Sequence, residues 1–133
     1  MAETFQFELV APEEIILSEA AEMVVVPGGD GDYGVLPRHA PMITTVRTGV
    51  LAVYEARKVR ERIFVAGGFA EVTPQRLTVL VEEALRLEGV KRADVEQALK
   101  DAQDDLLDAR DDSERAQTQR RIDIEQAKLQ ALS

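Results

Sequence analysis

The chain has 133 residues, enough for one domain of ordinary size or for a small domain with an appendage. Its composition, 45% hydrophobic and 31% charged, is that of a folded chain, and the absence of cysteine excludes disulfides and thiolate sites. The net charge of −9 opposes a phosphate backbone and argues against nucleic acid as a partner. No run approaches the ~20 apolar residues that span a bilayer, so we expect no direct membrane insertion.

Residues 1–87 have the pattern of an all-β domain of antiparallel strands, either a sandwich or a barrel. In the first run Phe5, Phe7 and Leu9 alternate with polar residues, the period of two expected of a half-buried strand. The last run is apolar on both faces, and glycine pairs at 28–29 and 67–68 are expected at turns or bulges where a Cβ atom would clash. The runs are TFQFELV, EEIIL, AEMVVV, YGVL, GVLAVYE, RIFVA, FAEV and RLTVLVE.

Residues 88–133 have the pattern of a two-helix antiparallel hairpin. After Gly89 the sequence has no glycine, proline or aromatic residue, and its apolar residues recur at steps of three and four. We expect helices over about 90–109 and 114–132, with Asp111 and Glu114 forming a capping box between them. The apolar positions of the first helix are Val95, Leu99, Ala102, Leu106 and Ala109, and those of the second are Ala116, Ile124, Ala127 and Ala131. Because the second set is mostly alanine, the hairpin is expected to be lightly held.

No catalytic, cofactor or metal site is predicted. The segment from Gly29 to Gly34 has the spacing GxGxxG, but Pro37 prevents the helix that dinucleotide binding requires, and no Glu stands where a calcium loop needs one. His39 is the only histidine, and none of the three serines lies in a strand–turn–helix elbow. Adjacent glutamates at 13–14 and 82–83 would point to opposite faces of a strand, so they do not form an acid/base pair.

Two motifs identify a resemblance that covers essentially the whole sequence. The first lies in GDYGVLPRHAPMITTVRTGVL and the second in VAGGFAEV, ahead of an alanine-rich helical tail. Together they closely resemble the epsilon subunits of bacterial and chloroplast F-type ATP synthases. The matching positions are Gly34, Leu36, Pro37, His39, Ala40 and Pro41, then Gly67, Gly68, Phe69, Glu71 and Val72. The family fold implied is a ten-stranded sandwich followed by two helices.

The resemblance implies a non-catalytic subunit of the central rotating stalk. In the family the sandwich binds the gamma subunit and rests on the c-subunit ring, and the matching c-ring-facing loop here carries Asp30, Asp32, Tyr33 and His39. The hairpin can extend toward the beta and alpha subunits and restrain ATP hydrolysis. The basic residues that would meet an acidic segment of beta are Arg115, Arg120, Arg121 and Lys128.

The family pattern for ATP binding, Ile/Leu-Asp-x-x-Arg-Ala, is degraded here. Aligning Arg92 and Ala93 with its end puts Gly89 where the aspartate belongs, so we predict no bound ATP or other cofactor. The resemblance places the protein peripherally on the cytoplasmic face of a bacterial inner membrane, or alternatively on the stromal face of the thylakoid.

Two alternatives stay open on the residues alone. The charged tail could be only a solvated hairpin, because exposed ion pairs contribute little. The whole molecule could also be an adaptor, with a β-sandwich scaffold and a helical docking arm.

Overall fold

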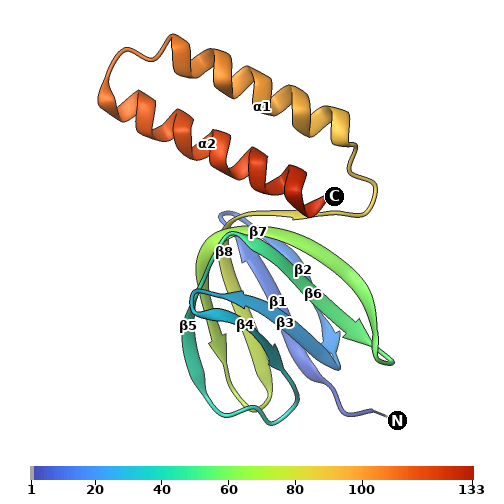
Figure 1. Ribbon diagram of the computed structural model, residues 1–133. Helices are drawn as coiled ribbons and strands as arrows, with labels where there is room; N and C mark the ends of the chain where they lie inside the picture. The colour runs from blue at the N-terminus through green and yellow to red at the C-terminus, as the bar shows by residue number, and fades with distance from the viewer. Residues whose placement is uncertain (1) are drawn as a thin grey trace. The chain divides into compact units, whose positions relative to one another are not determined.

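The computed structural model describes residues 2–133. The chain divides into two compact units, one ending at Glu88 and the other running from Gly89 to Ser133 (Figure 1). The first contains β1 (Phe5–Ala11), β2 (Glu14–Ala21), β3 (Met23–Gly28), β4 (Gly31–Val35), β5 (Met42–Val46), β6 (Gly49–Glu55), β7 (Lys58–Val72) and β8 (Arg76–Arg86). The second contains α1 (Arg92–Leu107) and α2 (Asp112–Ala131).

The strands form one continuous sheet that folds over on itself as a sandwich. Their order is β2-β1-β8-β7-β5-β3-β4, and β6 pairs with both β3 and β7 (Figure 1). The predicted fold, a sandwich followed by a helical hairpin, is therefore confirmed. One pair departs from the antiparallel expectation, because β1 and β8 run parallel. These are the first and last strands of the unit, so no short turn forces them to run in opposite directions.

Within residues 2–133 the strands number eight: β7 unites two of the eight predicted runs, and β5 is a strand that the runs did not include. RIFVA and FAEV lie on one strand of 15 residues, whose first half pairs with β6 and whose second half pairs with β5. The halves meet at Gly67 and Gly68. A Cβ atom on Gly68 would lie 1.9 Å from the carbonyl oxygen of Leu80 on β8, so glycine lets the strand bend without leaving the ladder.

The core of the sandwich follows the predicted alternation. Phe5, Phe7 and Leu9 all point inward and are at most 4% exposed. Strand β5, with the sequence MITTV, was absent from the predicted runs because its two threonines fall on opposite faces and hide the apolar pattern. The core cluster consists only of sandwich residues: Phe5, Phe7, Leu9, Leu17, Ala21, Val24, Val26, Val35, Val46, Leu51, Val53, Ile63, Val65, Ala70, Val72, Leu77, Val79 and Val81.

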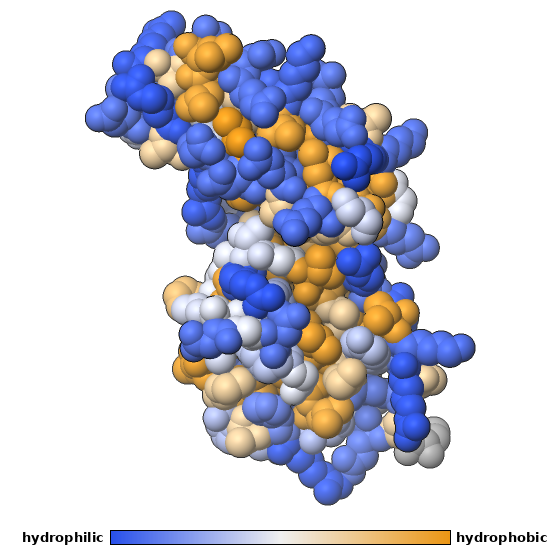
Figure 2. Space-filling view, viewed as in Figure 1, coloured by the Kyte–Doolittle hydropathy of each residue, from blue (hydrophilic) through white to orange (hydrophobic). Residues whose placement is uncertain are grey.

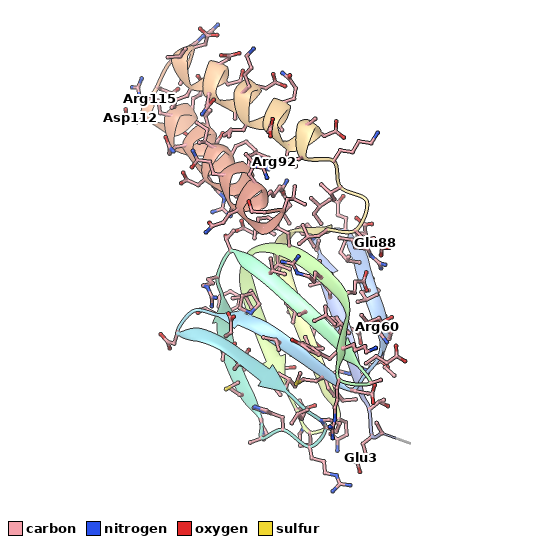
Figure 3. The ribbon with its side chains drawn as sticks, turned by 45° about the vertical axis from the view of Figure 1, so that its right-hand side comes forward. Glu3, Arg60, Glu88, Arg92, Asp112 and Arg115 are labelled. Carbon is pink, nitrogen blue, oxygen red and sulfur yellow. The ribbon has the colours of Figure 1, made fainter. Side chains whose placement is uncertain are left out.

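Side chains tie β2 to strands with which it shares no ladder. Arg60 on β7, labelled in Figure 3, forms an ion pair with Glu19 on β2 and a second one, at 3.2 Å, with Glu55 on β6. Arg86 on β8 donates to the main-chain oxygen of Ile16 at 3.0 Å. These bonds supplement the backbone pairing of β2, which runs along β1.

The second unit is the predicted hairpin. The Asp111 side chain accepts a hydrogen bond from the Glu114 amide at 2.8 Å, as expected of a helix N-cap. The Glu114 carboxylate reaches back to the amide of Arg110 at 2.8 Å, one residue earlier than a standard capping box requires. The cap starts α2 slightly ahead of its predicted start. Figure 2 shows hydrophilic residues over most of the hairpin, with apolar residues along the line between its helices.

Neither helix in residues 2–133 combines the length and the apolar character needed to span a membrane.

Candidate functional site

The segment from Asp30 to His39 was predicted to be one loop. In the structure it is a strand with irregular backbone on each side. Asp32 and Tyr33 lie in β4, where they pair with Pro27 and Val26 of β3. Asp30 lies in the tight turn before β4, and His39 lies in the irregular stretch after it. The turn residues predict the two ends correctly, and the predicted strand run YGVL overlaps β4, so only the assignment of the whole segment to one loop is wrong.

One open hollow of about 570 Å³ between β4 and β5 nevertheless brings the four residues to a common surface. The hydroxyl groups of Tyr33 and Thr44 share a hydrogen bond of 2.5 Å across it. The His39 ring donates from Nδ1 to the carbonyl oxygen of Ala40 at 2.7 Å. The lining residues are Gly28, Gly29, Asp30, Gly31, Asp32, Tyr33, His39, Met42, Ile43, Thr44 and Thr45.

Arg47, which sequence reasoning missed, contacts the turn between β3 and β4. Its guanidinium donates to the carbonyl oxygen of Gly28 at 2.6 Å and forms an ion pair with Asp32. Its own amide donates to the carbonyl oxygen of Pro27 at 2.9 Å. Only the pairing of β3 with β4 and β5 places Arg47 beside Asp32, which stands 15 residues earlier, so no local pattern could have signalled the contact.

Two positions of the turn, Gly28 and Gly29, leave little room for a side chain. A Cβ atom on Gly29 would lie 2.3 Å from the Thr45 hydroxyl, and one on Gly28 would lie 2.7 Å from the carbonyl oxygen of Gly31. The amide of Gly29 donates to the carbonyl oxygen of Thr45 at 3.0 Å. The turn is thus closely packed against β5 and offers a partner a fixed shape.

A second surface, which we name the apolar row, crosses four neighbouring strands on the outer face of the sandwich. It consists of Ile15 on β2, Val10 on β1, Leu80 on β8 and Phe69 on β7, each paired in register with the next. Ile15, Leu80 and Phe69 are 63%, 50% and 59% exposed. A hollow of about 450 Å³ lies along it, lined by Val10, Ala11, Pro12, Glu13, Gly68, Phe69, Leu80, Val81 and Glu82.

Exposed apolar side chains gathered in this way mark a protein contact surface. The sequence indicates this surface only through the run RLTVLVE, which is apolar on both faces although the core needs only one of them.

The four predicted regulatory cations are all engaged in the structure. Arg121 and Lys128 both bind the Glu125 carboxylate, at 3.2 and 3.1 Å, and Glu125 is only 4% exposed. Arg115 binds Asp112 at 3.0 Å near the start of α2, where Figure 3 shows them together. Arg120 also interacts with another group of the protein. Glu125 was not singled out from the sequence, although its spacing from both cations is that of helical ion pairs.

Across residues 2–133 no three His, Asp or Glu side chains are grouped so as to hold a metal ion. Gly89, which stands where the family pattern for ATP binding has aspartate, adopts φ +82°, a conformation that favours glycine over aspartate.

Comparison with protein families gives two matches that together span nearly all of the sequence. Residues 4–87 match the model described as ATP synthase, Delta/Epsilon chain, beta-sandwich domain. Residues 91–133 match the model of the C-terminal domain of the ATP synthase epsilon chain.

Individual relatives are similar over the same length. A protein of Rhodospirillum rubrum named ATP synthase epsilon chain is 51% identical over 131 residues, which is 98% of each chain. One of the same name from Rhodospirillum centenum is 49% identical, over 100% of this chain and 94% of its own.

Among solved structures, a chain of the Euglena gracilis mitochondrial ATP synthase, described as OSCP/F1/c-ring in rotational state 1, has a TM-score of 0.77. It is 26% identical, over 98% of this chain and 82% of its own. A chain from the central stalk and c-ring of the Tetrahymena thermophila mitochondrial ATP synthase has a TM-score of 0.65. That match covers 99% of this chain and 98% of the other, and at 12% identity it bears on the fold alone.

Proposed function

Because the protein belongs to the ATP synthase epsilon-chain family and is a non-catalytic stalk subunit, we propose that it couples the gamma subunit to the c-subunit ring. The observation that carries the proposal is that one rigid sandwich bears two exposed surfaces of different chemistry. One is the hollow between β4 and β5, whose lining mixes the acids Asp30 and Asp32 with apolar side chains such as Ile43, and the other is the apolar row. A subunit that transmits torque needs two such contacts on one stiff body.

The hollow between β4 and β5 is the proposed contact with the c ring. It gathers Asp30, Asp32, Tyr33 and His39, the residues that the family resemblance assigns to this role. The glycine turn fixes the shape of its rim, so little conformational entropy is lost when a partner binds. A polar loop of a c subunit is the complementary surface.

The apolar row is the proposed contact with gamma. Its side chains lie on neighbouring strands and are held by backbone pairing, so their exposure is a fixed property of the sheet. Burying them against an apolar face of gamma would supply affinity that does not depend on salt.

The hairpin is proposed to restrain ATP hydrolysis when it extends toward beta and alpha. Arg121 and Lys128 would then exchange the Glu125 carboxylate for an acidic segment of beta. Such an exchange conserves the number of ion pairs, so a modest difference in contact energy can shift the population from the folded hairpin to the extended one. In this arrangement the subunit is held at the cytoplasmic face of a bacterial inner membrane, or at the stromal face of a thylakoid, by its contact with the ring.

Cysteine crosslinking in the assembled complex tests the proposal. Asp30→Cys should form a disulfide with a cysteine placed in the polar loop of a c subunit, because Asp30 lies at the rim of the hollow. Ser18→Cys, an exposed conservative change on β2, serves as the matched control and should not crosslink to c. Purification through a tag on this subunit should also recover gamma and the catalytic subunits. Crosslinking of Asp30→Cys to beta alone would refute the assignment of this surface.

A further inference from the structure

The turn formed by residues 28–32, which we name the corner turn, depends on Arg47 for much of its attachment to β5. β3 and β5 share a single residue pair, Gly28 with Val46. Beyond that pair, the amide of Gly29 donates to the carbonyl oxygen of Thr45. Arg47 adds its main-chain bond to Pro27 and two side-chain contacts, to the Gly28 carbonyl and to the Asp32 carboxylate. One forked guanidinium therefore joins the ends of β3, β4 and β5.

The two acids of the corner turn have different surroundings. The Asp32 carboxylate is paired with Arg47 within the protein. The Asp30 carboxylate has no hydrogen bond or ion pair anywhere in residues 2–133, and it is exposed. Since the charge of Asp32 is already balanced, the negative charge that the turn offers to a partner is that of Asp30.

We infer that Arg47 is a positioning residue for the proposed contact with the c ring. It holds the corner turn in one shape and balances Asp32, which leaves Asp30 to meet a cationic or hydrogen-bond-donating group on the polar loop of a c subunit. This refines the assignment taken from the resemblance, because Asp32 then acts through Arg47 and does not itself bind the ring. The inference rests on the proposed function, because the ring is the partner.

Amide hydrogen exchange in the isolated subunit tests the first half of the inference. The amide of Gly29 should exchange about three- to tenfold faster in Arg47→Ala and in Asp32→Ala, a modest factor because both side chains are about half exposed. Asp30→Ala and Lys58→Ala should leave it unchanged. Lys58 is the matched control for loss of a cation, because it is exposed and has no ion pair in the described part of the chain.

Binding to a purified complex of gamma and the c ring tests the second half. Arg47→Ala and Asp32→Ala should each weaken binding about three- to tenfold, and the double variant should be no weaker than either single one, because the two residues act as one unit. Asp30→Ala should weaken binding and also reduce its dependence on salt. Arg47→Lys keeps the positive charge but loses the forked guanidinium, so its Gly29 exchange rate and its Kd should lie between those of the unaltered subunit and of Arg47→Ala. It replaces Arg47→Ala in both experiments if that variant does not fold.

Each failure has its own signature. Unchanged exchange at Gly29 in Arg47→Ala would overturn the inference and leave the proposed function intact. Losses that multiply in the Arg47→Ala, Asp32→Ala double variant would overturn it as well, since Asp32 would then contact the ring directly. If the unaltered subunit binds gamma alone as tightly as it binds gamma with the ring, the proposed contact with the ring is itself wrong.

Discussion

Replacing Phe69 with alanine should weaken the binding of this subunit to gamma without weakening the fold. Phe69 is 59% exposed in the sandwich, so the greater part of its ring lies outside the core. A phenylalanine presents about 200 Å² of surface, so about 120 Å² remains for a partner to bury, worth at most ~3 kcal/mol at ~25 cal/mol per Å². Part of that is lost to the cost of association, and we expect about 2 kcal/mol, or a rise of about 30-fold in Kd.

Leu80 is paired with Phe69 across β7 and β8 and provides an internal check on this value. Leu80 is 50% exposed, so a partner can bury about half of its side chain. Leu80→Ala should therefore cost about 1 kcal/mol of binding free energy, or a rise of about fivefold in Kd. The two side chains touch the same partner surface, so the loss in the double variant should differ from the sum of the single losses.

Titration of purified gamma with each variant, at low and at high salt, measures these losses. Val59→Ala is the matched control, because Val59 is 45% exposed on the same strand but lies outside the apolar row. Its Kd should equal that of the unaltered subunit, and the thermal midpoints of all variants should agree. Equal losses for Phe69→Ala and Val59→Ala, or a loss that disappears at high salt, would refute the assignment of the apolar row to gamma.

Three further predictions concern the fold and the hairpin. Gly68→Ala should destabilise the sandwich by about 1–3 kcal/mol in urea unfolding, through overpacking against β8. Gly34→Ala, whose Cβ would lie 3.6 Å from the nearest side chain, should be close to neutral, and equal effects would contradict this account. A fragment ending after Leu87 should still unfold cooperatively, because the core cluster contains sandwich residues only, and a molten fragment by near-UV circular dichroism would refute this. Deleting the hairpin should raise ATP hydrolysis in the assembled enzyme, Arg121→Ala with Lys128→Ala should reproduce part of the rise, and unchanged hydrolysis after the deletion would remove the inhibitory role.

Local periodicity was sufficient to predict the classes of element. The alternation of Phe5, Phe7 and Leu9 predicts a strand because adjacent side chains on a strand point to opposite faces, and the three are indeed buried. The cap at Asp111 is equally local, since its partner Glu114 is three residues away. Periodicity was not sufficient where the limits of an element depend on its pairing with other strands. The prediction divided β7 at Gly67 and Gly68, because glycine can mark either a turn or a bulge within a continuous strand.

The candidate surfaces lie beyond such local patterns for a physical reason. The apolar row joins residue 15 to residue 80, and the Arg47 contact joins residue 28 to residue 47, so both exist only once the strand order and register are known. The sequence does contain one local sign of such a surface, which is an apolar residue on the strand face that should point to solvent. Leu80 belongs to a strand that is apolar on both faces, yet a sandwich strand needs only one such face for the core. The second apolar face is therefore the local trace of a non-local surface, and it points to a partner before the register is known.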